Sequence, residues 1–344
     1  MRSYSVVKLT TFCEEVLLRL NLSREEARVL ADSLILADLR GVTSHGIVRL
    51  PTYVQRIETG VLDAKAEMQF ESNRGAVALL DARNGFGQLA GHKAMNTAID
   101  LAAKHGIGMV GVKNSNHFGI TAYYSMMALE RDMIGLVMTN ASPAIAPFGT
   151  ITPFLGTNPV SIAVPAAKEN PIVLDMSMSV VARGKIRYSA LINKEIPLGW
   201  ALDEQGNPTT DPNTALKGSL VPIGGAKGSG LSLIIDILCG ILTGSCLTGE
   251  VKNITDMSGP AQTGHVFVAI NIASFIDPDR FKESVDTVIR KIKALPSKQG
   301  EVVYMAGEIE HNLEETRRRE GIALDQDVVK ALNSLSERFG IEKL

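Results

Sequence analysis

The sequence predicts an α/β protein in which helices cover a sheet, joined to a helical N-terminal segment. Between residues 7 and 40, apolar residues recur at the spacing of two amphipathic helices. From about residue 71 the pattern changes, because strand-like apolar runs alternate with helix-like segments. The chain has 344 residues, 45% of them hydrophobic, which is enough for two domains. We therefore expect a helical domain over residues 1–70, joined by C-terminal helices at 310–344, and an α/β domain over residues 71–309.

The composition favours a protein that binds neither nucleic acid nor membrane. The net charge is −2, and no block of Lys or Arg stands out. The three cysteines form no Cys-x-x-Cys pair and the six histidines show no ligand spacing, so we predict neither a disulfide framework nor a metal site. The longest apolar run, 231–242, is too short to cross a bilayer, and the N-terminus lacks the pattern of a secretion signal. We therefore expect the protein in the cytoplasm.

The helical segment ends in a polar stretch that is a candidate binding site. Ser23 and Glu26 form a capping box at the start of the second helix, which Gly41 ends. A third predicted helix follows, and its start carries His45 and Arg49 four residues apart, so that one helical face can present both. The alternative is that His45 caps the helix and Arg49 is an ordinary surface arginine.

His117 is the candidate for proton transfer. It lies between a strand-like run at 107–112 and a helix-like run at 120–129, with asparagines nearby. The unperturbed pKa of histidine lies close to neutral pH, which suits a general acid or base. A histidine in a polar turn can also serve only to hydrogen-bond that turn.

Three further stretches indicate nucleotide binding. Gly85 to Gly91 imitates a dinucleotide fingerprint, but the next strand ends in Lys113-Asn114 without the required acidic residue, so a Rossmann fold is not favoured. Asp175 follows a strand and suits a ribose clamp or a helix cap. Gly224 to Gly230, with Lys227, precedes an apolar helix expected at 231–242 and suits a phosphate, although it is not a Walker A loop.

The loop at 140–160 is the longest predicted segment without regular structure. It contains four prolines, with apolar residues between them, and the apolar residues favour an ordered loop. Such a loop suits the wall of a flat-ring site such as one for nicotinamide, and the alternative is a packed connector.

Several short motifs, in one order, carry a resemblance to a known family. The motifs are Thr43-Ser44-His45-Gly46 with Arg49, Asn116-His117-Phe118-Gly119, Pro147-Phe148-Gly149, Gly156-Thr157-Asn158-Pro159, Asp175-Met176-Ser177, Gly184-Lys185, Thr209-Thr210-Asp211-Pro212, Lys227-Gly228 and Gly307-Glu308. Together they resemble the malate/L-lactate dehydrogenase family, which lacks a Rossmann fold and includes L-sulfolactate dehydrogenase, ureidoglycolate dehydrogenase and diketogulonate reductase. The resemblance runs from about residue 7 to 340, and the portion 113–160 is most similar to the malate and sulfolactate branch.

The resemblance implies a three-layer α/β/α fold that binds NAD or NADP in a non-Rossmann arrangement, a helical second domain and a homodimer. It implies interconversion of a 2-hydroxy acid and its 2-oxo acid by hydride transfer. The implied proton-transfer residues are His117 and His45. The implied substrate-binding residues are Ser44, Arg49, Asn158 and Arg183. The implied cofactor-binding residues are Asn140, Thr157, Asp175, Met176, Ser177, Lys227, Gly228, Gly307 and Glu308.

The sequence leaves other functions open. Within the same family, a ureidoglycolate dehydrogenase or a diketogulonate or imino-acid reductase is possible, as is a relative that binds a nucleotide without catalysis. A hydrolase using Ser115 beside His117 is disfavoured, because no Gly-x-Ser-x-Gly elbow is present and adjacent residues point apart. The particular acid, the choice of NAD or NADP and the physiological direction are not readable from the residues.

Overall fold

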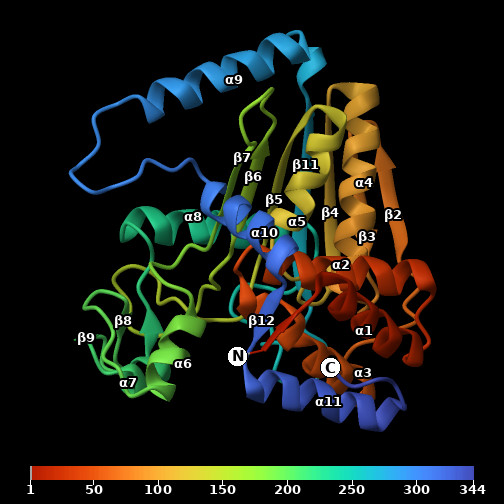
Figure 1. Ribbon diagram of the computed structural model, residues 1–344, viewed down its shortest axis with the longest axis vertical. Helices are drawn as coiled ribbons and strands as arrows, with labels where there is room; N and C mark the ends of the chain where they lie inside the picture. Colours follow the sequence, from red (N-terminus) through yellow and green to blue (C-terminus); the bar gives the residue numbers. More distant parts are fainter. Residues whose placement is uncertain (1) are drawn as a thin grey trace.

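The computed structural model describes residues 2–344, and at its centre lies a seven-stranded sheet (Figure 1). In spatial order its strands are β2 (Gln69–Arg74), β3 (Val77–Asp81), β4 (Ile107–Ser115), β11 (Thr263–Asn271), β5 (Met133–Thr139), β6 (Val160–Val164) and β7 (Ile172–Met176). Only β3 and β4 run parallel, and every other neighbouring pair is antiparallel. A sheet of this kind is not the parallel sheet of a Rossmann domain.

Strand β11 occupies the middle of the sheet although it comes late in the chain. Its residue Ile270 pairs with Ile107 of β4 on one side and with Ile134 of β5 on the other. Val266 and Phe267 are both fully buried, because both faces of this strand are covered. The continuous apolar run of β11 is therefore the pattern expected of a fully buried strand.

Helices cover both faces of the sheet, which confirms the expected three layers (Figure 1). Helix α4 (Gly87–His105) packs on one face, next to the short α5 (Ala122–Ser125) and a 3₁₀ helix at Met126–Arg131. Helix α8 (Ala226–Asp236) and the π-helix Ile237–Ile241 that continues it cover the opposite face.

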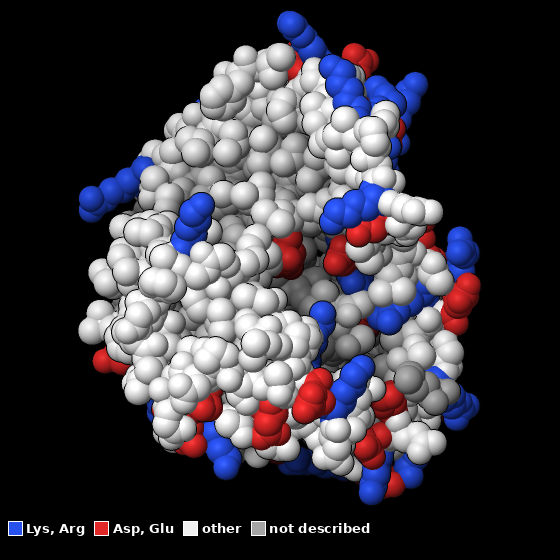
Figure 2. All heavy atoms as spheres, turned by 90° about the vertical axis from the view of Figure 1, so that its left-hand side faces the viewer, with Lys and Arg blue, Asp and Glu red and all other residues white. Residues whose placement is uncertain are grey.

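The outer side of α8 and its continuation is apolar yet exposed. Leu231, Ile234, Ile241 and Leu242 each keep about half or more of their surface accessible. Figure 2 views the side of the molecule on which α8 lies, and it shows broad areas without charged side chains. A soluble monomer seldom presents an apolar area of this extent.

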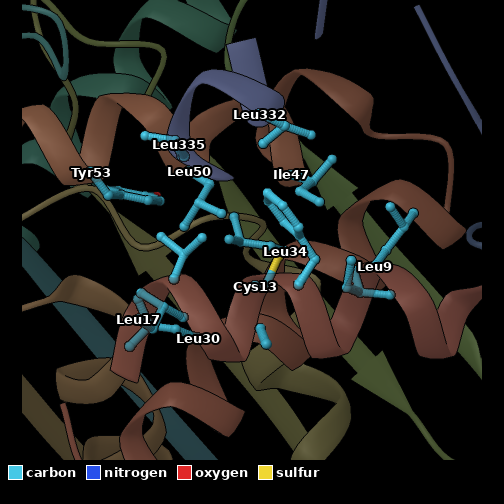
Figure 3. Close-up of a cluster of buried hydrophobic side chains, with 14 of the residues drawn as sticks. Leu9, Cys13, Leu17, Leu30, Leu34, Ile47, Leu50, Tyr53, Leu332 and Leu335 are labelled. Carbon is cyan, nitrogen blue, oxygen red and sulfur yellow. The ribbon is translucent and has the colours of Figure 1, made fainter. Parts of the chain in front are cut away.

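The two ends of the chain pack together below the sheet. Here α1 (Val6–Arg19), α2 (Arg24–Leu39) and α3 (Leu50–Glu58) share one hydrophobic core with α11 (Gln326–Phe339). In Figure 3, leucines from α1 and α2 point toward Leu332 and Leu335 of α11. Strands β1 (Arg2–Tyr4) and β12 (Ile322–Leu324) add an antiparallel ladder between the ends. The predicted capping box of α2 is confirmed, since Ser23 and Glu26 cap each other's backbone N–H.

The remaining elements surround the sheet. A small sheet of β8 (Ala201–Leu202), β9 (Pro208–Thr209) and β10 (Ser219–Leu220) lies beside α6 (Arg183–Leu191) and α7 (Pro212–Lys217). Helix α9 (Pro278–Lys293) follows β11 through a 3₁₀ turn at Ile272–Ser274, and α10 (Glu308–Glu320) reaches back to α2. Arg40, the C-cap of α2, forms a buried ion pair with α10, from its Nη1 to Glu314 Oε2 at 3.2 Å. This ion pair fixes α10 beside the helical core.

Candidate active site

One large cavity lies where the helical core meets the sheet. Its volume is about 730 Å³, in the range of pockets that hold drug-sized ligands and cofactors. Its walls come from the segment after α2, the loop after β4, the end of β7, the start of α6 and the start of α10. The predicted site residues that line it are Ser44, His45, Arg49, His117, Asn140, Thr157, Asp175, Met176, Ser177, Arg183 and Gly307. Four predicted residues, Asn158, Lys227, Gly228 and Glu308, lie outside its lining.

The segment that carries His45 and Arg49 differs from the prediction. Instead of one helix, two 3₁₀ turns, Thr43–His45 and Ile47–Arg49, precede α3. Asp38 pins the turns, because its Oδ2 accepts the Ile47 N–H at 2.7 Å. Gly46 between the turns has no room for a side chain, since a Cβ there would lie 2.1 Å from Asp38 Oδ1.

The pinned turns still direct both predicted side chains into the cavity. Arg49 Nε donates to the Ser44 carbonyl at 2.6 Å, and the Ser44 hydroxyl lies 2.9 Å from His45 Nδ1. Burial and, to a smaller extent, the charge of Arg49 lower the pKa of His45 to about 4. His45 is therefore neutral at physiological pH, while Arg49 supplies positive charge.

His117 leaves β4 on a tightly packed loop. The N-terminus of α4 approaches this loop so closely that a Cβ at Gly87 would lie 2.2 Å from the Asn116 carbonyl oxygen. The glycines that imitate a dinucleotide fingerprint thus serve helix packing. The His117 Nδ1 atom lies 2.8 Å from the Tyr53 hydroxyl, and the Gly119 N–H points to the same nitrogen at 3.4 Å.

The rings of His117 and His45 stack, with centroids 5.2 Å apart and planes 21° from parallel. Burial lowers the pKa of His117 well below its ordinary value, and the nearby His45 and Arg49 lower it further. A neutral imidazole and a guanidinium therefore line the same cavity, although they come from separate parts of the chain. A neutral imidazole can take a proton from a bound hydroxyl, and a guanidinium can hold a carboxylate through two hydrogen bonds.

Helix α6 contributes two further guanidinium groups to the cavity. Arg183 is partly fixed, since its Nη2 donates to the Leu216 carbonyl at 2.7 Å. Arg187, one turn later, also lines the cavity and was not predicted from the sequence. Burial lowers the pKa of both Arg49 and Arg183, and in each case the positive charge of Arg187 lowers it further. Arg187 is thus near both. The i, i+4 spacing of Arg183 and Arg187 was the available signal.

Asp175 and Gly307 lie on the wall formed by β7 and α10. Asp175 Oδ2 accepts the Ala122 N–H at 2.9 Å, and burial raises the pKa of this carboxyl to about 6. The backbone of Gly307 has φ +83°, and a Cβ there would lie 2.6 Å from the Val173 carbonyl oxygen, so glycine is required. Glu308 opens α10 but turns away, because its carboxylate pairs with Lys293 at 2.6 Å. The Asp175 carboxylate and the N-terminus of α10 are groups suited to a ribose hydroxyl and a phosphate.

The structure corrects the role assigned to Asn158. Its side chain is fully buried, its oxygen accepts the Ala141 N–H at 2.9 Å, and its NH₂ group donates to the Ser232 carbonyl at 2.9 Å and to Asp236 Oδ2 at 3.2 Å. Both ends of the amide are therefore engaged within the protein. Asn158 holds the loop after β5 against α8 rather than contacting the substrate.

The glycine-rich stretch around Lys227 also differs from the prediction. Helix α8 begins at Ala226, not at residue 231, so Lys227 and Gly228 lie in its first turn. Lys227 is exposed, and a Cβ at Gly228 would lie 1.9 Å from the Ile223 carbonyl oxygen. Gly228 therefore permits a close helix contact, and neither residue lines the cavity.

The arrangement around Ser115 argues against a hydrolase. Ser115 is fully buried, and its hydroxyl lies 2.8 Å from Nε2 of His265, not beside His117. The other nitrogen of His265 lies 2.7 Å from the Thr139 hydroxyl. Among residues 2–344, no group of three or more His, Cys, Asp or Glu side chains is arranged to hold a metal ion. The same residues contain no helix that is long and apolar enough to span a membrane.

Comparisons with known proteins identify the family of the chain. The family profile described as malate/L-lactate dehydrogenase matches residues 4–333. A malate/(S)-sulfolactate dehydrogenase of Methanothermus fervidus is 42% identical over 328 residues, which cover 95% of each chain. The solved structure of sulfolactate dehydrogenase from Methanocaldococcus jannaschii superposes with a TM-score of 0.95 at 36% identity, over 99% of this chain and 98% of that one.

A second solved structure gives the same result. Malate dehydrogenase from Pyrococcus horikoshii superposes with a TM-score of 0.92 at 38% identity, over 100% of this chain and 97% of that one. The match therefore spans both the sheet and the helical core, and it includes every segment that lines the cavity. The chain belongs to the malate/L-lactate dehydrogenase family and is an NAD(P)-dependent oxidoreductase of 2-hydroxy acids.

Proposed function

We propose that this enzyme interconverts a 2-hydroxy acid that carries a second acidic group, of the malate or sulfolactate type, and the corresponding 2-oxo acid. The observation that carries the proposal is the neutral His117 and the cationic Arg49 on the wall of one cavity. Arg49 holds the carboxylate next to the reacting carbon, because a guanidinium can form the bidentate contact that a lysine cannot. His117 accepts the hydroxyl proton in oxidation and returns it in reduction.

When bound, NAD or NADP would supply the hydride chemistry at the carbon that carries the hydroxyl. We propose that Asp175 accepts a ribose hydroxyl and that the N-terminus of α10 at Gly307 faces a phosphate. The wall that contains Met176 and Ser177 suits the same ligand because it combines apolar and hydroxyl surface. Lys227 and Gly228 stay a prediction, because the cavity lining does not include them.

Arg183 and Arg187 support the assignment of a substrate with two acidic groups. Of the five arginines that line the cavity, Arg40 is paired with Glu314 and Arg56 donates to two backbone carbonyls. The two arginines on α6 are not needed for the carboxylate that Arg49 holds. Like charges gathered around a cavity are stabilised by a bound anion that spans them. A substrate such as lactate, with one acidic group, would leave the charges on α6 unbalanced.

The test is a panel of 2-oxo acids assayed with NADH and with NADPH at 340 nm. We expect faster turnover with oxaloacetate or sulfopyruvate than with pyruvate. We also expect His117→Ala to lose most of kcat while its dinucleotide affinity is unchanged, and the exposed His105→Ala on α4 to be a silent control. Hydride transfer at the wild-type rate in His117→Ala, followed by stopped flow, would exclude the proposed role.

We further propose that the active form is a homodimer in the cytoplasm. The exposed apolar side of α8 and its continuation supports the dimer, and the three free cysteine thiols agree with a reducing compartment. Light scattering should give twice the chain mass of 36.9 kDa. Ile234→Lys should lower this mass, whereas Phe275→Lys, at an exposed site elsewhere, should not. A monomeric wild-type enzyme with full activity would contradict the dimer.

A further inference from the structure

A chain of hydrogen bonds runs from the buried core to His117. Gln88 of α4 is completely buried, and its Nε2 donates to the Tyr53 hydroxyl of α3 at 2.6 Å. The Tyr53 oxygen in turn lies 2.8 Å from Nδ1 of His117. Neither Gln88 nor Tyr53 lines the cavity, so both act on the reaction only through the histidine.

The donors in this series of hydrogen bonds determine which ring nitrogen of His117 carries the proton. The Gly119 N–H points to Nδ1 and, as a backbone amide, it can only donate. The Tyr53 oxygen accepts from the NH₂ group of Gln88, which leaves its own hydroxyl proton to donate to Nδ1. With two donors directed at Nδ1, the neutral ring carries its proton on Nε2. In this form His117 can donate a hydrogen bond to a 2-oxo group but cannot accept a proton at Nε2.

The other end of Gln88 is unusual. Its Oε1 is buried and has no hydrogen-bond partner among residues 2–344. A half-turn of the amide exchanges Oε1 and Nε2, so that Tyr53 meets an acceptor instead of a donor. The amide atom of Gln88 that points away from Tyr53 has no hydrogen-bond partner in either orientation. The two orientations therefore make the same number of hydrogen bonds along Gln88, Tyr53 and His117, and the second gives up only the long 3.4 Å contact from the Gly119 N–H to Nδ1.

Oxidation of a 2-hydroxy acid needs the second orientation. The substrate O–H bond breaks and an Nε2–H bond forms, while the hydride leaves the neighbouring carbon with its electron pair for the cofactor. Nε2 must be unprotonated before this step, so the neutral ring must carry its proton on Nδ1. The Nδ1 proton also stays in place in the imidazolium that results. An Nδ1–H needs an acceptor, and the Tyr53 oxygen becomes one only when its own proton turns toward Oε1 of Gln88.

We propose that Gln88 and Tyr53 form a reversible hydrogen-bond chain that sets the protonated nitrogen of His117, with rotation of the Gln88 amide as the switch. Both are positioning residues, and the inference rests on the proposed role of His117. Burial raises the pKa of Tyr53, so the hydroxyl stays protonated and redirects a hydrogen bond without giving up its proton. In reduction the same chain accepts from Nδ1 while Nε2 returns its proton to the new hydroxyl.

The test reads the tautomer of His117 directly by ¹⁵N NMR of histidine-labelled protein, with His117→Gln used to assign the signals. Wild type should carry the proton on Nε2. Gln88→Glu offers an acceptor to Tyr53 whether or not the carboxyl is ionised, so the proton should move to Nδ1 and kcat should stay within a few-fold of wild type. Gln88→Met, of similar volume, offers no acceptor, and kcat should fall about tenfold or more because the Nδ1–H loses its partner.

Tyr53→Phe should lower kcat by a similar factor, with KM for the acid within about twofold because Arg49 still binds the carboxylate. Tyr123→Phe, a substitution of the same kind on α5, should change neither the tautomer nor kcat. The proposal would be overturned if the same ring nitrogen carried the proton in wild type and in Gln88→Glu. It would also be overturned if Gln88→Met and Gln88→Glu lost kcat equally. An active His117→Ala would instead remove the proposed function, and the tautomer measurement would still stand as an independent result.

Discussion

Replacing Arg187 by glutamine tests whether α6 recognises the second acidic group of the substrate. The change removes one charge from the cavity wall and leaves Arg49 in place. A hydrogen bond between charged groups contributes about 1.5–3 kcal/mol, and an exposed ion pair about 0.2–1 kcal/mol. Arg187 is exposed but faces a cavity that a ligand closes, so we expect about 1–2 kcal/mol. This loss corresponds to a rise in KM of about 5- to 30-fold for a substrate with two acidic groups.

The assay compares kcat and KM for oxaloacetate and pyruvate in wild type, Arg187→Gln and Lys185→Gln. Lys185 lies on the same helix, is exposed and does not line the cavity, so its substitution changes the net charge equally. KM for oxaloacetate should rise only in Arg187→Gln, and KM for pyruvate should change by less than about twofold, since pyruvate lacks the second group. Equal effects on both acids, or equal effects of the two substitutions, would refute the reasoning.

Three further predictions follow from the same geometry. Arg49→Lys should raise KM for every 2-oxo acid by about tenfold or more, because lysine cannot bind a carboxylate bidentately, and an unchanged KM in steady-state assays would exclude Arg49. Burial lowers the pKa of His265 to about 3. Between pH 6.5 and 3, His265 is therefore protonated in the unfolded chain but neutral in the native state. The stability that depends on neutral His265 is present above pH 6.5 and is lost as the pH falls. The difference in urea midpoint between wild type and His265→Gln should therefore change with pH, with wild type losing more from pH 7 to 5, and parallel pH profiles would contradict this. Leu34→Ala, at a fully buried site in the helical core, should cost about 2–5 kcal/mol of unfolding free energy in urea titrations, whereas the exposed Leu18→Ala should cost little.

Local patterns predicted several helices and strands of this protein, because those elements follow from apolar spacing and caps. The capping box of Ser23 and the strand predicted at 107–112, which lies within β4, belong to this group. The central place of β11 did not follow, since the pairing of a late strand with β4 and β5 depends on contacts far apart in the sequence. The short strand β2, whose residues are mostly polar and exposed, gave no apolar alternation to recognise.

The site was predicted unevenly for a similar reason. His117 and Arg49 carry chemistry that the motifs indicate directly, and both line the cavity. Tyr53 and Gln88 look like ordinary helical residues, and only the packing of α3 against α4 makes them partners of the histidine. Lys227 was placed in a loop because glycines suggest one, although in the structure these glycines allow α8 to start early and pack closely.

The position of β11 also affects how a growing polypeptide acquires this structure. Until residues 263–271 have left the ribosome, β4 and β5 have no strand between them, and each presents an unpaired edge. More than three quarters of the protein must therefore be synthesised before the sheet closes, and α11 joins the helical core later still. Such long-range closure is slow and leaves apolar edges open to aggregation. We expect that chains truncated before residue 263 require chaperones to stay soluble, whereas the complete protein does not.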